Sequence, residues 1–279
     1  MSPPPVDPER PRHDPLTVVA IALLAYVIGD VLHEAVGHGG ACLLVGGRPL
    51  VLSTVHLECD SHAAGAWGER FIAAGGTLVN LCAGALVALV VRRRAASSSG
   101  AVAWFLWLLM AVNLLSGTGY FLFSGIGGIG DWAAFVRGLG PAWVTRLGLT
   151  LLGGGTYWLV VLRAVRALDP FLSGEGDERV RSATRMTLPA YLAGGILSCI
   201  AGLFNPVGMV LVAISAAAAS FGGTSGLAWM PQLLHGPRAA APGGTLLLVS
   251  RSWGWIVLGV VAAAVFVLVL GPGVRFAAS

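Results

Sequence analysis

The sequence has 279 residues, of which 56% are hydrophobic and only 11% are charged, and its mean hydropathy is +0.81. Soluble domains carry about 25% charged residues, so this composition excludes an ordinary water-soluble protein. The formal net charge of +4 comes from 17 arginines, with no lysine. Most of these arginines lie between apolar runs rather than in a stripe, which argues against nucleic acid as a partner and for the lipid bilayer.

Proline and polar residues fill positions 1–16, so we expect a disordered segment there. Several apolar runs that follow reach the roughly 20 residues needed to cross about 30 Å of hydrocarbon. They predict an all-α polytopic protein of the cell membrane with six or seven transmembrane helices. The predicted spans are approximately residues 17–45, 70–91, 101–123, 144–165, 189–221 and 253–270. Asn205 and Pro206 interrupt the fifth, which is either one kinked helix or two short ones.

Three connecting segments have a distinctive composition. Residues 50–57 are rich in Val, Leu and Thr, which predicts a short β-like segment or hairpin after the first span. Residues 124–132 contain four glycines, which predicts irregular backbone leading into Asp131. An arginine-rich loop up to Thr187 is expected to follow the fourth span.

The second half of the first span contains the sequence HEAVGH, which places His33, Glu34 and His38 within six residues. In the usual H-E-x-x-H zinc motif the two histidines are four residues apart and share one helix face. Here they are five apart, and an ideal α-helix would separate them by about 140°. A π-bulge adds one residue to a turn and restores a shared face, and nearby glycines ease that distortion. The spacing therefore predicts a π-bulge that supports a metal site.

A catalytic zinc ion needs three protein ligands and keeps one position for water, so a third ligand must come from elsewhere in the chain. We expect Asp131 to supply it, with Glu34 as the general base that takes a proton from the attacking water. Two alternatives remain open. The cluster of His33, Glu34 and His38 would also suit a transport pathway, and Asp131 would also suit a turn or a helix cap.

A second polar run follows the β-like segment. It consists of His56, Glu58, Cys59, Asp60 and His62. We expect surface residues here, with an accessory metal site or a disulfide between Cys42 and Cys59 as the alternatives. The other two cysteines, Cys82 and Cys199, lie in apolar runs and are expected to be packing residues.

Three segments of the first half carry recognisable motifs. Residues 33–47 read HEAVGHGGACLLVGG, residues 73–86 read AAGGTLVNLCAGAL, and residues 113–132 read NLLSGTGYFLFSGIGGIGDW. They resemble, in that order, the zinc helix, the A-G-P-x-x-N-L helix and the N-x-x-P…D-G segment of the site-2-protease family of intramembrane zinc metalloproteases. The resemblance places Asn80 and Asn113 on the asparagines of that family, near the active site, and Asp131 on its third zinc ligand.

The resemblance covers residues 17–135 and implies a zinc-dependent protease core over residues 17–140, with three transmembrane helices and a membrane-associated protein substrate. Residues 141–279 add further transmembrane helices without recognised chemistry. The chain departs from the family pattern in four places. These are the histidine spacing, Gly75 and Thr77 in place of a Gly-Pro turn, the long distance from Asn113 to Asp131, and Trp132 in place of a glycine.

The arginines also predict an orientation. With seven spans, twelve arginines lie on the side of the N-terminus and five on the other, which places the N-terminus in the cytoplasm. That orientation puts the end of the first span outside, whereas the resemblance implies a zinc site toward the cytoplasm. The leading hypothesis is a zinc-dependent intramembrane endopeptidase. The alternative is a non-proteolytic membrane protein, either a transporter or a metal-binding relative without turnover, and the sequence does not predict an oligomeric state.

Overall fold

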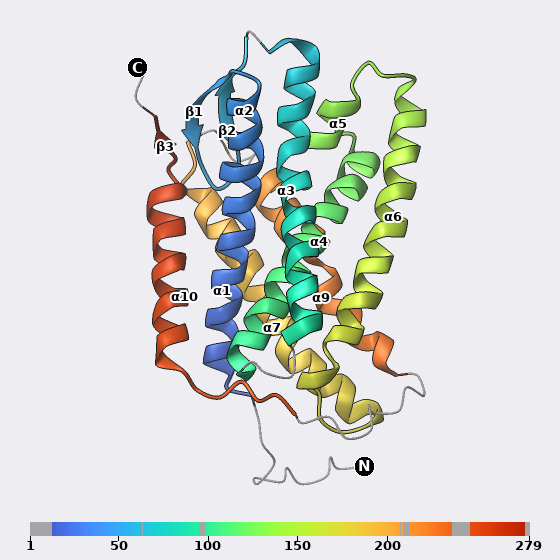
Figure 1. Cartoon of the computed structure of the whole chain (residues 1–279), viewed down its shortest axis with the longest axis vertical. Helices are drawn as coiled ribbons and strands as arrows, with labels where there is room; N and C mark the ends of the chain where they lie inside the picture. Colours follow the sequence, from blue (N-terminus) through green and yellow to red (C-terminus); the bar gives the residue numbers. More distant parts are fainter. Residues whose placement is uncertain are drawn as a thin grey trace.

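The computed structural model describes residues 13–62, 64–94, 99–206, 208, 213–235 and 246–276. Within this part, six helices are long and apolar enough to cross a membrane, which confirms the predicted all-α polytopic fold. They are Pro15–Leu44, Gly65–Arg93, Gly100–Gly127, Ala142–Phe171, Gly176–Leu203 and Trp253–Leu270. They stand side by side in one bundle, with a small sheet at one end (Figure 1). The chain is therefore a multi-pass membrane protein.

The N-terminal helix begins earlier than the composition predicts. Helix α1 spans Pro15–Val31, and the carboxylate of Asp14 caps it by accepting a hydrogen bond from the Thr17 backbone N–H at 2.9 Å. Proline suits the first turn of a helix because its missing N–H has no helical partner there. Residues 13–16 are therefore ordered, contrary to the prediction, and residues 1–12 lie outside the described part of the chain.

The first span changes its helical geometry where the histidines lie. The π-helix η1 covers Leu32–Gly39, and α2 continues the span over Gly40–Leu44. This confirms the π distortion predicted from the histidine spacing. Gly37 permits a close crossing with α3 (Gly65–Arg94), because a Cβ atom at position 37 would lie 2.4 Å from the Cα atom of Gly76.

The predicted extended segment is a hairpin of β1 (Arg48–Leu52) and β2 (Leu57–Asp60). A third strand, β3 (Val274–Arg275), follows the last span and pairs antiparallel with the other edge of β1. The strand order is β2-β1-β3. The sequence predicts the hairpin but not β3, whose two residues carry no strand pattern of their own.

Helix α4 (Gly100–Gly127) is longer than predicted, so the expectation of irregular backbone is wrong for residues 124–127. Gly125 serves packing there, because a Cβ atom would lie 2.6 Å from the Thr150 nitrogen. The guanidinium of Arg146 also donates a hydrogen bond to the Gly125 carbonyl at 3.1 Å. The irregular backbone is confined to residues 128–130, where Gly128 and Gly130 have φ values of 68° and 83°.

The fourth span is α6 (Ala142–Ala167), followed by the short 3-10 helix η2 (Asp169–Phe171). The predicted loop up to Thr187 is wrong, because α7 begins at Gly176 and continues to Leu203. Acidic residues in its first turn favour a helix start, and Arg179 pairs with Asp169 at 2.9 Å. The predicted fifth span is two pieces, since α7 ends before Asn205 and the chain continues as the π-helix η3 (Ala213–Gly222).

The segment after α7 carries the chain back across the bundle. It consists of η3, α9 (Gly226–Trp229) and the 3-10 helix η4 (Met230–Leu234). Ala216 packs against Val55 beside the hairpin, and His235 lies 3.8 Å from Asp177 at the start of α7. The last span, α10 (Trp253–Val265) with the π-helix η5 (Phe266–Leu270), then returns to the sheet. The described chain therefore runs from one end of the bundle to the other seven times, six times as a long helix and once as this broken segment.

The bundle has two distinct ends. We call the end with the three strands and α5 (Asp131–Val136) the sheet end, and the opposite end, where α1 and α7 begin, the arginine end (Figure 1). A buried core between them draws on α1, α4, α6 and α7, and includes the stacked rings of Trp104 and Trp107. This core contains residues from both sides of residue 140, so the two halves of the chain pack as one bundle.

Candidate metal centre

The π-helix η1 directs the two histidines of the first span to one point. The Nε2 atoms of His33 and His38 lie 3.2 Å apart. Oδ2 of Asp131, 98 residues after His33, lies 3.3 Å from the first Nε2 atom and 3.4 Å from the second. The histidine side chains are 7% and 10% exposed, and that of Asp131 is 24% exposed. The structure thus brings all three predicted metal ligands together.

The outer nitrogen of each histidine is held by a protein acceptor. His33 Nδ1–H donates to Asn80 Oδ1 at 2.6 Å, and His38 Nδ1–H donates to the Ile72 carbonyl at 2.7 Å. We assign both protons from the hydrogen-bond network. In a neutral imidazole the other nitrogen then carries a lone pair, so the two Nε2 lone pairs point toward Asp131 and each other.

Asn80 and Asn113, the two predicted supporting residues, lie behind His33. Asn80 Nδ2 donates to Asn113 Oδ1 at 2.7 Å and to the Gly29 carbonyl at 3.0 Å, which leaves its oxygen to accept from His33. Asn113 Nδ2 donates in turn to the Leu109 carbonyl at 2.8 Å. Both side chains are buried. This chain of hydrogen bonds fixes the tautomer and the orientation of the His33 ring.

The donor atoms fit a zinc ion. Two lone pairs facing each other at 3.2 Å repel unless a cation or a proton lies between them. Zinc–nitrogen bonds of about 2.0–2.1 Å in a tetrahedron place ligand atoms about 3.3 Å apart, which matches the three observed distances. Gly76 leaves room beside them, because a Cβ atom there would lie 2.5 Å from one Nε2 atom and 2.6 Å from the other. Two imidazoles with one carboxylate form a common zinc set.

Asp131 reaches the histidines because the chain turns at two glycines with positive φ and restarts as α5. Burial disfavours its ionised form. When the Nε2 atoms carry a proton instead of facing a metal ion, the hydrogen bonds that His33 and His38 donate to Asp131, together with their positive charge, outweigh that effect and hold the pKa of this carboxyl below its usual value. The site thus presents a carboxylate rather than a carboxylic acid. Next to it, the ring of Tyr120 stacks on the ring of His33, with centroids 4.6 Å apart.

Glu34 is the remaining acidic group at this site. It is 6% exposed, and its Oε2 atom is buried without a hydrogen-bond partner in the described part of the chain. One ligand-type atom from each of His33, Glu34 and His38 lies within 4.8 Å of the others, so Glu34 is an alternative third ligand. We assign that role to Asp131, because its oxygen is closer to both nitrogens and Glu34 is then free to exchange protons.

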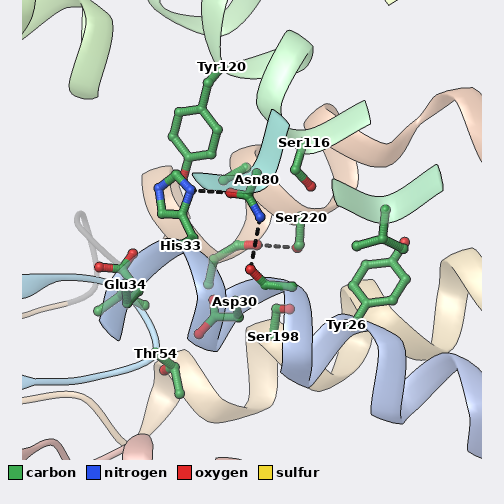
Figure 2. Close-up of a pocket in the computed structure, with 15 residues that line it drawn as sticks. Tyr26, Asp30, His33, Glu34, Thr54, Asn80, Ser116, Tyr120, Ser198 and Ser220 are labelled. Carbon is green, nitrogen blue, oxygen red and sulfur yellow. Dashed lines mark hydrogen bonds between the residues drawn. The ribbon is translucent and has the colours of Figure 1, made fainter. Parts of the chain in front are cut away.

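A polar cavity adjoins Glu34 inside the bundle and extends toward Tyr26 (Figure 2). It leaves about 60 Å³ for water-sized molecules. Its polar lining includes Asp30, Ser116, Ser198 and Ser220, and Thr54, whose buried Oγ1 atom has no hydrogen-bond partner among the described residues. Asp30 and Tyr120 were not predicted as site residues from the sequence. Asp30 could have been found, since an aspartate four residues before Glu34 in an apolar helix shares its face.

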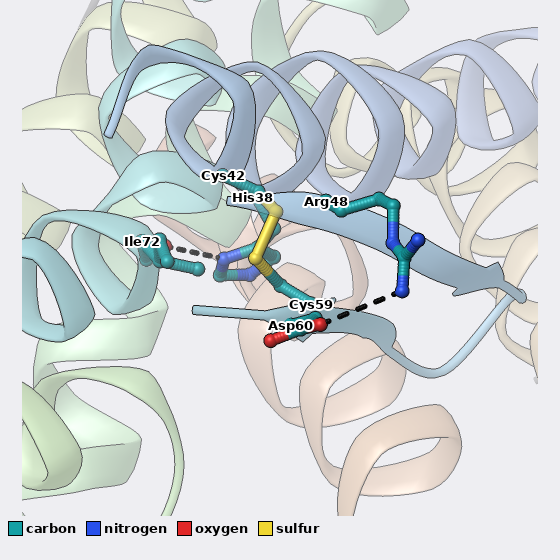
Figure 3. Close-up of a disulfide and its surroundings, with 6 residues drawn as sticks. All are labelled: His38, Cys42, Arg48, Cys59, Asp60 and Ile72. Atoms are coloured by element: carbon teal, nitrogen blue, oxygen red, sulfur yellow. Dashed lines mark hydrogen bonds and ion pairs between the residues drawn. A yellow bond between two sulfur atoms is a disulfide. The ribbon is translucent and has the colours of Figure 1, made fainter. Parts of the chain in front are cut away.

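The polar run after β1 forms a disulfide rather than a second metal site. Cys42 and Cys59 are bridged, which joins α2 to β2 one turn beyond His38 (Figure 3). Asp60 pairs with Arg48 at 3.6 Å, and His56 Nδ1 lies 3.0 Å from the Ser53 hydroxyl. None of these side chains belongs to the group of potential metal ligands found among the described residues, which consists of His33, Glu34 and His38.

Comparison with known proteins adds no relative. No protein-family model, no curated protein and no solved structure matches this chain. The assignment of the site therefore depends on the geometry and chemistry of its own residues.

Proposed function

We propose that the protein is a zinc-dependent intramembrane endopeptidase, similar to the site-2 proteases, that hydrolyses membrane-associated protein substrates in the cell membrane. One observation carries this proposal. The donor atoms of His33, His38 and Asp131 converge at 3.2–3.4 Å beside Glu34, whose buried Oε2 atom has no partner among the described residues.

In this proposal His33, His38 and Asp131 hold the zinc ion. A bound zinc ion lowers the pKa of a water molecule toward neutrality and polarises a substrate carbonyl. Glu34 accepts one proton from the attacking water as its oxygen bonds to the carbonyl carbon. Glu34 then returns that proton to the leaving nitrogen as the C–N bond breaks. One water molecule is consumed, and its atoms are divided between the new acid and the new amine.

Hydrolysis inside a bilayer also needs a supply of water. A cavity needs about 10–15 Å³ to hold the centre of one water molecule, so the 60 Å³ cavity beside Glu34 has room for several. Asp30, Thr54 and Ser220 line it with hydrogen-bonding groups. The cavity therefore suits a local store of water next to the proposed base.

A second candidate is a non-proteolytic membrane protein, and the same cavity favours it. Asp30 and Glu34 are one helical turn apart and face a polar space inside the bundle, which is also typical of an ion pathway. A transporter of this kind does not need stoichiometric zinc. An inactive relative of the proteases would bind zinc without cutting any peptide bond.

Metal analysis and a hydrolysis assay together separate these functions. The detergent-purified protein should contain about one zinc ion per chain and hydrolyse fluorescein-labelled casein. Glu34→Gln should keep the zinc and lose at least about 100-fold in rate, the typical contribution of a general base. A His33→Ala, His38→Ala double variant should lose both. Undiminished hydrolysis by Glu34→Gln, or stoichiometric zinc in the double variant, would contradict the proposal.

A further inference from the structure

The two ends of the bundle differ in positive charge. Nine described arginines lie at or near the arginine end, and five lie at the sheet end. The nine are Arg92, Arg93, Arg94, Arg163, Arg166, Arg179, Arg181, Arg185 and Arg251, and the five are Arg48, Arg70, Arg137, Arg146 and Arg275. Positive residues in short connections accumulate on the cytoplasmic side of membrane proteins. The charge distribution therefore places the arginine end in the cytoplasm.

The disulfide gives independent evidence on the same question. Cys42 and Cys59 are bridged at the sheet end, where α2 meets the hairpin (Figure 3). Disulfides form and persist in oxidising compartments and are rare in the cytosol. The two remaining cysteines, Cys82 and Cys199, lie within α3 and α7 and are free. The position of the bridge thus places the sheet end on the non-cytoplasmic side.

The metal centre belongs to the sheet end. His38 precedes the bridged Cys42 by one helical turn, and Asp131 begins α5 just beyond the end of α4. Asp131 is also the most exposed of the three proposed ligands, at 24% against 7% and 10% for the histidines. The side of the site that is open therefore points out of the bundle at this end.

We propose that the metal centre opens to the oxidising, non-cytoplasmic compartment and acts on the non-cytoplasmic segments of membrane-anchored proteins. The choice of substrate segment depends on the proposed protease function, whereas the orientation does not. The Cys42–Cys59 bridge ties the end of the zinc-binding helix to β2, and in this orientation it lies in a compartment that keeps it oxidised.

Cysteine labelling in intact cells tests the orientation. In a Cys82→Ser, Cys199→Ser background, one variant carries Gly140→Cys at the sheet end and a matched one carries Ser173→Cys at the arginine end. Both positions are exposed, and nothing lies within 4 Å of a Cβ atom at Gly140. A membrane-impermeant maleimide should label Gly140→Cys at least about tenfold more than Ser173→Cys, and permeabilisation should remove the difference.

Alkylation of acid-quenched cells tests the bridge. Cys42 and Cys59 should react with a maleimide only after reduction. Preferential labelling of Ser173→Cys in intact cells, or free thiols at Cys42 and Cys59 before reduction, would overturn the proposal. Neither measurement needs zinc or hydrolysis, and Glu34→Gln should give the same pattern, so failure of the protease assignment is distinguishable from failure of the orientation.

Discussion

The two ends of the bundle contain histidines with different bonding: His13 at the arginine end is half-buried, and His33 and His38 at the sheet end are buried. At the arginine end, His13 Nε2–H donates to the Phe171 carbonyl at 2.8 Å, and His13 Nδ1 accepts from the Val249 N–H at 3.2 Å. Both ring nitrogens of His13 are therefore satisfied by the protein. At the sheet end, His33 and His38 each use one nitrogen for a protein acceptor and direct the other to a shared point. The nitrogen that no protein acceptor holds, rather than burial, distinguishes the proposed metal ligands His33 and His38 from the structural histidine His13.

The carboxylates next to these histidines follow the same contrast. Asp14 at the arginine end accepts from Thr17 and from Arg251, the latter at 2.9 Å. Glu34 at the sheet end has a buried oxygen without a partner among the described residues. Buried polar groups without partners are costly, so the carboxylate of Glu34 gains from a bound cation or water, whereas Asp14 already has its partners.

The largest expected effect is the loss of metal from single histidine variants. His33→Ala and His38→Ala should each reduce zinc from about one per chain to almost none, because two remaining ligands are too few for a zinc site. His13→Ala is the matched control from the other end and should keep the metal. Zinc content of the three purified proteins decides the matter, and equal loss in His13→Ala would remove the distinction between the two ends.

A smaller but still severe effect is expected at Gly76. A methyl group there would lie 2.5 Å from His33 Nε2 and 2.6 Å from His38 Nε2. Gly76→Ala should therefore weaken zinc binding at least about 100-fold, the upper end of effects seen for residues behind the ligands. Gly155→Ala is the control, since nothing lies within 4 Å of its Cβ position. Competition with a chelator measures both affinities, and unchanged affinity in Gly76→Ala would show that the metal binds elsewhere.

The hydrogen-bond chain behind His33 should give a graded response. Asn80→Ala removes the acceptor for His33 Nδ1–H and should weaken zinc binding about tenfold, whereas Asn113→Ala, one bond further away, should cost less. The same chelator competition applies. The reverse order of effects would mean that this series of hydrogen bonds does not orient the His33 ring.

The smallest effect is a pH dependence at the arginine end. Burial lowers the pKa of His13 below its usual value, so the unfolded state binds a proton at higher pH than the folded state does. The free energy of unfolding should therefore decrease as the pH falls below about 6.5. His13→Gln can still donate and accept, and should show a smaller drop in melting temperature between pH 7.5 and pH 5.5. Identical drops in the two proteins would exclude His13 as the cause.

Much of the fold could be predicted from local pattern. Long apolar runs mark the spans because crossing the bilayer sets a minimum length. The five-residue spacing of His33 and His38 predicts the π-helix because an ideal α-helix separates them and a π-turn restores a shared face. The helical conformation of residues 124–127 is not predicted because Gly125 serves a close contact with Thr150 of α6, which the sequence does not display. The helical start of α7 is not predicted because an arginine-rich segment is typical of a loop. The ion pair between Arg179 and Asp169, which accompanies the helix, forms only in the folded chain.

The candidate site shows the same limit. The sequence selects His33, Glu34, His38 and Asp131 by chemistry, and the structure places them together. The cavity lined by Asp30 depends on which helices surround α1, since Ser198 and Ser220 come from α7 and η3, far along the chain. Such a space follows from tertiary packing and has no local signature.

The pairing of β3 with β1 has a consequence for assembly of the protein in the cell. Spans enter the membrane in order during synthesis, and β3 follows the last of them. The sheet beside the candidate metal centre therefore cannot be complete until α10 has been inserted. A partly synthesised chain would lack this strand, which would delay maturation of the site until the whole bundle is in place.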